Sequence, residues 1–355
     1  MNPANRLHAL GQSLWLDNIT RTLVQDGTLA RYIRDIAVTG LTSNPTIFEQ
    51  AIRNGGVYDA AIRAKAAVGL YDEALFFELA IEDLAAAADL FAPEFARTAG
   101  VDGWVSLEVS PLLADDTEAT VQAALALHTR AARPNLYIKI PGTPAGIPAI
   151  EEAIAAGVPV NVTLLFSAEQ YLAAADAWVR GIERRLDAGL PANVSSVASV
   201  FVSRWDGAAK AQLPDALHNR LGVAMMGRCY REYRKLLISP RWQKLVAAGV
   251  SPQRLLFAST STKDPALADS YYVDALAAPD TVNTIPEKTL LAYAEQGNPG
   301  PVLPADGGDC ETVLAAIAAA GVDIDALALK LQRDGAASFV KSWQELIACI
   351  ATKAG

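Results

Sequence analysis

Residues 136–166, LYIKIPGTPAGIPAIEEAIAAGVPVNVTLLF, contain two short β-prone runs, LYIKI and PVNVTLLF, separated by a segment with a helical pattern. Such a strand–helix–strand unit is typical of a parallel sheet covered by helices. Lys139 stands inside the first run, between apolar neighbours. An ammonium group is rarely buried without a partner, so this lysine lies either at an exposed sheet edge or at a site where its burial serves chemistry. The run alone favours the edge, and the rest of the chain reverses that preference.

The same alternation of strand and helix continues along the chain of 355 residues. The β-prone runs are eight in number and fall at residues 13–17, 37–41, 104–110, 136–140, 159–166, 197–203, 255–259 and 281–285. Eight parallel strands with intervening helices predict a single (β/α)8 barrel, or TIM barrel, which needs about 250 residues. The remainder is expected as helical insertions near 45–102 and 205–254 and as a helical tail over 323–350. We expect one barrel domain over residues 1–355, with the tail broken into two helices at Asp334-Gly335.

Composition narrows the classes of partner. The net charge of −9 provides no basic field for nucleic acid or for an anionic membrane surface. The amino terminus has no continuous apolar segment and no later apolar run reaches the length of a membrane span, so we expect a soluble, cytoplasmic protein. The three cysteines are far apart and suit unpaired thiols. The three histidines show no metal-ligand spacing, so no metal is expected.

Polar residues stand at or just after the ends of nearly every predicted strand. In a barrel of this kind the active site is built at the carboxyl ends of the strands. The candidates are Asp17, Asn44, Glu108, Lys139, Asn161, Thr163, Ser199, Phe201, Arg204 and Lys263. Single residues have simpler explanations: Asn44 before Pro45 is a good helix N-cap, and Asp17 and Glu108 could be turn formers. The convergence of a lysine, carboxylates and an arginine on one barrel mouth favours a catalytic site.

The lysine indicates the chemistry. A desolvated lysine amine can attack a carbonyl, and the resulting iminium ion is an electron sink that allows a ketose to be cleaved between carbons 3 and 4. Cleavage requires a base for the C4 hydroxyl, and we assign Asp17 to that role. Imine formation and hydrolysis require proton transfers through water, for which we assign Glu108 and Thr163.

These residues lie in segments that together resemble the transaldolase family, in particular its longer bacterial branch. The matching segments, in order along the chain, are LWLDNI (14–19), GLTSNPTIF (40–48), SLEVSP (106–111), YIKIPGT (137–143), NVTLLFS (161–167), FVSRWD (201–206), ASTSTKDP (258–265) and VNTIPE (282–287). Any one of them would be a weak signal, but eight in the right order over nearly the whole chain are specific.

The resemblance implies a barrel with the Schiff-base lysine, Lys139, on its fourth strand. It gives Asp17 the acid/base role in carbon–carbon cleavage, and gives Glu108 and Thr163 the handling of a catalytic water. By the same resemblance, the residues that hold substrate hydroxyls or line the phosphate end are Asn44, Asn161, Ser199 and Arg204. The family requires no metal or organic cofactor. In one departure, Lys263 follows the seventh strand where shorter members have an arginine, so a point charge replaces a bidentate fork.

The implied activity is transfer of a dihydroxyacetone unit from sedoheptulose 7-phosphate or fructose 6-phosphate to an aldose phosphate, in the pentose phosphate pathway. One alternative is an aldolase that releases free dihydroxyacetone; relatives with that activity tend to carry glutamine where this chain has Glu108. A second alternative is a non-catalytic barrel that binds sugar phosphates. The expected partners are sugar phosphates, and the sequence leaves monomer and homodimer open.

Overall fold

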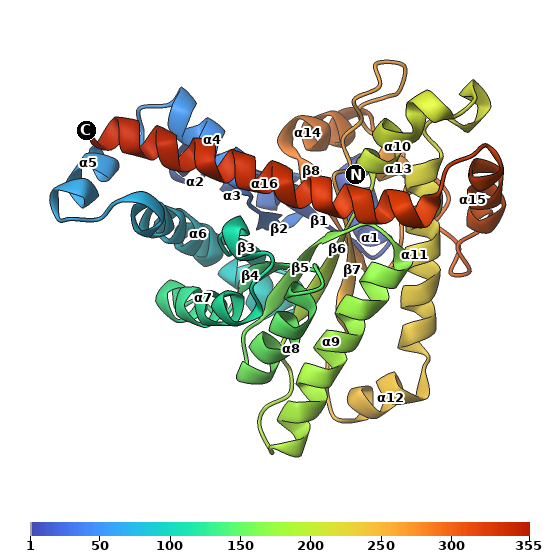
Figure 1. Cartoon of the computed structure of the whole chain (residues 1–355), viewed down its shortest axis with the longest axis horizontal. Helices are drawn as coiled ribbons and strands as arrows, with labels where there is room; N and C mark the ends of the chain where they lie inside the picture. The colour runs from blue at the N-terminus through green and yellow to red at the C-terminus, as the bar shows by residue number, and fades with distance from the viewer. Residues whose placement is uncertain (1) are drawn as a thin grey trace.

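The chain folds into a closed barrel of parallel strands, each joined to the next in sequence order and the last joined to the first. The computed structural model describes residues 2–355. The strands are β1 (Gln12–Asp17), β2 (Val38–Thr42), β3 (Trp104–Glu108), β4 (Leu136–Pro141), β5 (Val160–Leu165), β6 (Ser196–Phe201), β7 (Arg254–Ala258) and β8 (Thr281–Pro286). All eight predicted strands are confirmed, with shifts of one or two residues at their ends. Figure 1 shows the barrel surrounded by helices.

Helices follow every strand and cover the outside of the barrel. They are α1 (Pro3–Ala9), α2 (Arg21–Gln25), α3 (Thr28–Asp35), α4 (Pro45–Asn54), α5 (Asp59–Ala67), α6 (Asp72–Arg97), α7 (Thr117–Ala131), α8 (Gly146–Ala156), α9 (Ala168–Asp187), α10 (Ser203–Ala209), α11 (Leu221–Leu237), α12 (Pro240–Ala247), α13 (Tyr271–Ala275), α14 (Glu287–Gln296), α15 (Cys310–Ala319) and α16 (Ile324–Ala354). Short 3-10 turns occur at Pro111–Leu113, Lys210–Gln212 and Asp215–Leu217. The extra helices α4–α6 and α11–α12 fall where insertions were expected.

Local signals in the sequence set several helix starts. Asn44 caps α4, because its side chain accepts the backbone N–H of Ile47, and Pro45 occupies the first helical position. Ser167 and Gln170 form a capping box at the start of α9. The cap predicted at Asn44 is therefore present, and it fixes that side chain at the end of β2.

The closed barrel answers the question raised by Lys139. A closed sheet has no edge, and Lys139 is only 5% exposed within β4. Its register partners are Glu108 on β3 and Asn161 on β5. The exposed-edge interpretation is therefore wrong, and the lysine lies inside the barrel beside a carboxylate.

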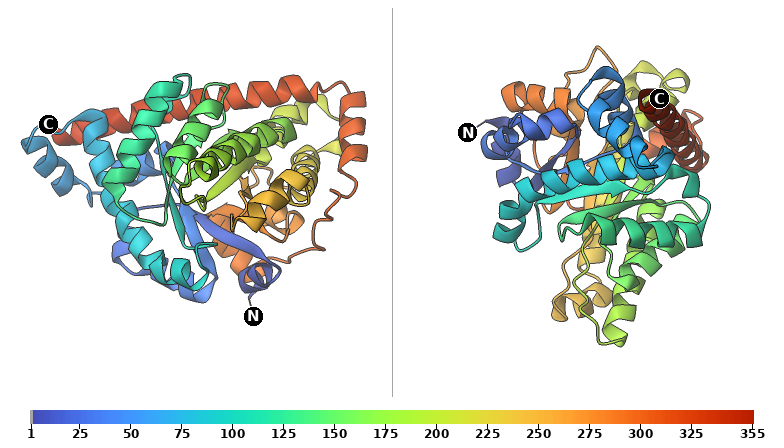
Figure 2. Two further views of the ribbon diagram at one scale, coloured as in Figure 1. Left: turned by 90° about the horizontal axis from the view of Figure 1, so that it is seen from below. Right: turned by 90° about the vertical axis from the view of Figure 1, so that its left-hand side faces the viewer.

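The predicted break in the tail at Asp334-Gly335 is also wrong, because α16 runs without interruption from Ile324 to Ala354. Glycine in a helix interior costs roughly 0.5–1 kcal/mol relative to alanine, which is why the sequence suggested a break. Packing overrides that preference: α16 lies across the barrel mouth and contacts α4, α5, α6, α10 and the end of β5. Figure 2 shows it running along one end of the barrel.

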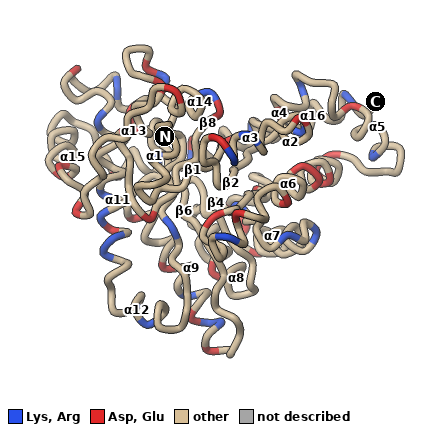
Figure 3. The backbone as a smooth tube through the Cα atoms, turned by 180° about the vertical axis from the view of Figure 1, so that it is seen from behind, with Lys and Arg blue, Asp and Glu red and all other residues tan. Residues whose placement is uncertain are grey.

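Acidic and basic residues are interspersed along the outer helices, as the colours of the backbone in Figure 3 show for one view of the molecule. On α11, for example, Arg228 pairs with Glu311, and Arg234 pairs with Asp280. Within residues 2–355, no single helix is long and apolar enough to cross a membrane. The helices α15 and α16 would pass such a test only together, and they meet at a bend of 93°.

Candidate active site

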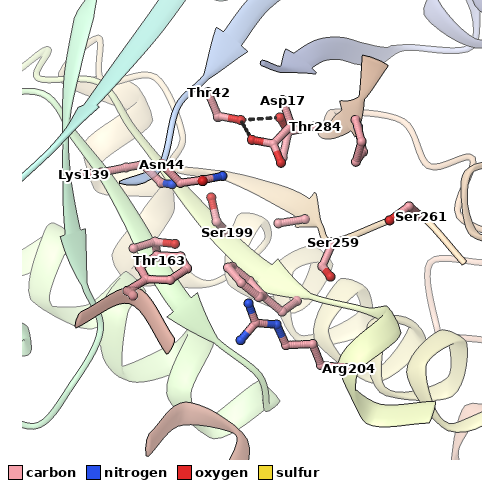
Figure 4. Close-up of a pocket in the computed structure, with 14 residues that line it drawn as sticks. Asp17, Thr42, Asn44, Lys139, Thr163, Ser199, Arg204, Ser259, Ser261 and Thr284 are labelled. Carbon is pink, nitrogen blue, oxygen red and sulfur yellow. Dashed lines mark hydrogen bonds between the residues drawn. The ribbon is translucent and has the colours of Figure 1, made fainter. Parts of the chain in front are cut away.

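A cavity of about 160 Å³ opens at the carboxyl ends of the strands. Its lining comes from β1, β2, β4, β5, β6, β7 and β8, from the segments that follow them, and from α16. The lining residues are Asp17, Thr42, Asn44, Lys139, Thr163, Ser199, Phe201, Arg204, Ala258, Ser259, Ser261, Thr284, Pro286 and Phe339. Seven of these were candidates from the sequence. Figure 4 shows Lys139 on one side of the cavity and Arg204 reaching in from another.

The Lys139 ammonium is surrounded by protein on several sides. Its Nζ donates to the backbone carbonyl of Ser43 at 3.0 Å and lies 3.5 Å from Glu108 Oε2. The ring of Phe339, on α16, has its centroid 6.0 Å from Nζ. The immediate charged neighbour is thus a carboxylate, held at the same level of the barrel by the pairing of β3 with β4.

Asp17 ends β1, and its side chain accepts a hydrogen bond from the neighbouring strand β2. Thr42 Oγ1 donates to Asp17 Oδ1 at 2.7 Å and is 2.6 Å from Thr284 Oγ1. Figure 4 shows this cluster with both contacts dashed. Burial raises the pKa of the Asp17 carboxyl, while the charge of Lys139 and the hydrogen bond from Thr42 partly oppose that rise. A carboxyl with a raised pKa, facing a cavity beside an amine, is suited to proton transfer.

Glu108 ends β3 and is 6% exposed. Burial raises the pKa of its carboxyl, the charge of Lys139 and its hydrogen bond lower it, and the charge of Asp17 raises it further. Glu108 does not line the cavity directly and contacts it through Lys139. Both carboxylates bond side chains on neighbouring strands.

The backbone is irregular at two places beside the cavity. The pairing of β5 with β6 shifts register between Val162 and Leu165, and Leu164 adopts a left-handed φ of 58°. Ser259, directly after β7, has the same φ of 58°. Such irregularities occur preferentially at functional sites, where they redirect side chains. The preceding residue, Thr163, lines the cavity, and its buried Oγ1 has no hydrogen-bond partner among the protein groups of residues 2–355.

Arg204, at the start of α10, supplies the positive charge of the cavity wall. Its guanidinium carbon lies 5.2 Å from the ring centroid of Phe201. No acidic side chain in the described part of the chain forms an ion pair with it, and burial lowers the pKa of the guanidinium. A half-buried cation without a carboxylate partner is suited to bind an anionic ligand.

The amide and hydroxyl candidates occupy two levels. Asn44 and Ser199 line the cavity, whereas Asn161 is fully buried beneath it. The Asn161 amide donates to Ser106 Oγ at 3.1 Å and accepts from Ser199 Oγ at 2.7 Å. Asn161 therefore reaches the cavity through Ser199 in this conformation, and a direct contact of Asn161 with substrate stays a prediction.

Lys263 lies apart from the other candidates. It is exposed and lines a neighbouring cavity of about 310 Å³, which shares Arg204 and Ser259 with the first one. Ser259 and Ser261, from the same segment, line the first cavity instead.

The lining residues that received no role from the sequence include Thr42, Thr284 and Phe339. The two threonines stand at strand ends like the other candidates, so their positions could have revealed them. Phe339 lies far along the chain in an amphipathic helix, and only the path of α16 across the mouth places it there.

A parallel barrel with a buried lysine and strand-end carboxylates at its mouth is an arrangement suited to carbonyl chemistry. The sequence profile of the Transaldolase/Fructose-6-phosphate aldolase family matches residues 14–350, and the chain belongs to that family. It is 44% identical to a transaldolase of Acidothermus cellulolyticus, covering 98% of this chain and 96% of the relative. It is 42% identical to a transaldolase of Parafrankia sp., with 99% and 98% covered, and 41% identical to one of Neisseria gonorrhoeae, with 96% and 97% covered.

Proposed function

We propose that this protein is a transaldolase that moves a dihydroxyacetone unit from sedoheptulose 7-phosphate or fructose 6-phosphate to an aldose phosphate. Relatives named transaldolase match it over nearly its full length. The observation that carries the proposal is the buried Lys139 amine, which faces the mouth cavity with Glu108 3.5 Å away and Asp17 in the same wall. A barrel that only bound sugar phosphates would have no use for a lysine so placed.

The first stage is formation of an imine between Lys139 and the C2 carbonyl of the ketose. The amine must lose its proton before it attacks, and Glu108 is the nearest carboxylate to Nζ. The raised pKa of Glu108, due first to burial, suits a group that accepts and returns a proton. Thr163 offers an unpartnered hydroxyl in the cavity that can orient the water released on imine formation and consumed on hydrolysis.

The second stage is cleavage between C3 and C4. Asp17 takes the proton from the C4 hydroxyl, the C3–C4 bond breaks, and its electron pair moves into the iminium to give an enamine on Lys139. The aldose phosphate leaves with its new carbonyl at former C4. A second aldose phosphate then enters, the enamine carbon attacks its carbonyl, and Asp17 returns the proton to the new hydroxyl.

The phosphate of either substrate is held at the far side of the cavity. Arg204 is the unpaired cation there, and Ser259 and Ser261 lie in the same wall. Lys263 stays our proposed second cation, approaching from the neighbouring cavity. Asn44, Ser199 and Asn161 would hold the hydroxyls between the two ends, with Phe201 packing beneath Arg204. We also propose a cytoplasmic location and a monomeric or homodimeric assembly.

The test is incubation with fructose 6-phosphate, with and without erythrose 4-phosphate or glyceraldehyde 3-phosphate, measuring both the new ketose phosphate and free dihydroxyacetone. Transfer that depends on the acceptor, with little free dihydroxyacetone, is expected. Release of dihydroxyacetone at the same rate without acceptor would show an aldolase instead. Binding with neither product, and no adduct on borohydride reduction, would show a non-catalytic barrel.

A further inference from the structure

Gly335 is buried in the interior of α16, a helix of 31 residues. Glycine is the least favourable residue for a helix interior apart from proline, so packing must account for its presence there. The side of α16 that carries Gly335 meets the cavity wall at the end where Arg204 lies.

A side chain at position 335 would collide with that wall. A Cβ built on Gly335 would lie 3.0 Å from Leu164 Cδ2 and 3.3 Å from Arg204 Nη1, with Phe166 next at 3.6 Å. Both of the closer contacts are tighter than ordinary van der Waals contact, so the ends of the Leu164 and Arg204 side chains would have to give way by a few tenths of an ångström. The Arg204 guanidinium therefore lies close enough to α16 that a side chain at position 335 would meet it.

The helix is held in this position by Gln332, one turn before Gly335. Gln332 is buried, and its Nε2 donates to the carbonyl of Gly142 at 2.9 Å and to that of Leu164 at 3.0 Å. These carbonyls belong to the ends of β4 and β5, so the amide fixes both the height and the rotation of α16 over the mouth. Leu164 is also the residue nearest to a Cβ built on Gly335. The end of β5 therefore both anchors α16 and limits how closely α16 approaches the barrel mouth.

We propose that Gly335 is a positioning residue for Arg204 and, through it, a determinant of the enzyme's preference for phosphate monoesters. The absence of a side chain at position 335 leaves the guanidinium its place beside α16, at the depth where it meets the anionic end of the substrate. This inference rests on the proposed function, in which Arg204 holds the phosphate. It assigns a role in specificity to a residue that lies 131 positions after Arg204 in the sequence, in a helix outside the eight βα units.

A methyl group at position 335 should displace the guanidinium by a few tenths of an ångström. Charge-assisted hydrogen bonds depend steeply on distance and alignment, so such a shift weakens the hydrogen bonds from Arg204 to the phosphate. The amine of Lys139 is held by Ser43 and Glu108, which do not contact Gly335, so the chemical steps should be unaffected.

The experiment compares Gly335→Ala with Ser338→Ala, an exposed position on the same helix. For Gly335→Ala we expect the KM for fructose 6-phosphate and the inhibition constant of inorganic phosphate to rise about tenfold, with kcat within about twofold. Unphosphorylated fructose should keep its kcat/KM, and Ser338→Ala should match wild type throughout. Equal losses with fructose and fructose 6-phosphate, or no change in either phosphate constant, would overturn the inference.

Three further variants make the result decisive. Because the closest contact is with Leu164, the double variant Gly335→Ala/Leu164→Ala removes that collision and leaves the one with Arg204. The phosphate-specific loss should persist relative to Leu164→Ala alone; full restoration would show that Gly335 acts only through core packing. Arg204→Ala separates the inference from its premise. If Arg204→Ala impairs phosphate binding and Gly335→Ala does not, only the role of Gly335 is wrong; if neither does, the proposed phosphate site is wrong as well.

Discussion

The substitution Asp17→Asn tests most directly whether Asp17 serves cleavage while Glu108 serves imine formation and hydrolysis. Asparagine has nearly the same shape as aspartate, and its Oδ1 can still accept the hydrogen bond from Thr42 that holds Asp17 in place. The Thr42–Thr284 contact needs no change either. The substitution therefore removes the proton acceptor and leaves the cavity wall intact.

The expected loss can be set from the size of general-base catalysis. A positioned base contributes typically about 100- to 10,000-fold, so the rate should fall at least about 100-fold, or about 2.7 kcal/mol in the barrier. The loss should fall on cleavage alone, because imine formation uses Lys139 and Glu108. The variant should accumulate the imine of the uncleaved ketose.

Borohydride reduction followed by mass spectrometry of the intact protein distinguishes the stages. After incubation with fructose 6-phosphate, wild type should carry a reduced three-carbon adduct on Lys139, and Asp17→Asn should carry the whole six-carbon phosphate. A three-carbon adduct forming in Asp17→Asn at the wild-type rate would refute the assignment of Asp17 as the cleavage base. Absence of any adduct from the variant would place Asp17 in imine formation instead.

The raised pKa of Asp17 adds a test on stability. Because burial raises the folded-state pKa, protonated Asp17 is favoured in the folded protein, and this contribution is complete below about pH 4, the range of an unfolded aspartate. It is lost as the pH rises through the folded-state value. The asparagine of the Asp17→Asn variant does not titrate. The unfolding midpoint of the variant should therefore rise relative to that of wild type as the pH increases from about 4 to neutrality. A difference that shrinks over this range would contradict the raised pKa.

Outcomes are also expected for four further substitutions. Lys139→Arg keeps a positive charge and removes the nucleophile, so activity should fall to background and no borohydride adduct should form, while circular dichroism shows a folded protein. Glu108→Gln should slow both formation and hydrolysis of the imine in single-turnover experiments while leaving the mass of the trapped adduct at three carbons. Arg204→Ala should raise the KM for fructose 6-phosphate by one to two orders of magnitude, from a contact worth roughly 1.5–3 kcal/mol, and leave fructose unchanged; Lys263→Ala should show the same pattern more weakly.

The sequence was sufficient for the barrel because its strands and helices are local patterns. The eight strand positions follow from short β-prone runs, and the closure of the sheet follows from their number and order. Position at a strand end was also enough to select Lys139, Asp17 and Thr163, since such side chains converge at the mouth of any such barrel.

The parts that the sequence could not provide depend on tertiary packing. Gly335 looks like a helix break because propensity is local, whereas its contacts with Leu164 and Arg204 come from distant segments. Phe339 reaches the cavity for the same reason. Lys263 is one of several polar residues after β7, and only the path of that segment decides which of them faces the cavity.

The two carboxylates are identical in their chemistry, so their surroundings must separate their roles. Burial raises both pKa values, but Asp17 receives the Thr42 hydroxyl, which favours its ionised form, and the charge of Asp17 in turn favours protonated Glu108. Both carboxyls are therefore suited to exchange protons beside the same amine, and the charge of Asp17 acts on the pKa of Glu108. The coupling predicts that Asp17→Asn, by removing a negative charge, lowers the pKa of Glu108. The pH dependence of the surviving imine-forming step, in which Glu108 exchanges protons, should then shift to a lower pH than in wild type. An unchanged pH profile for imine formation would mean that the two carboxylates act independently.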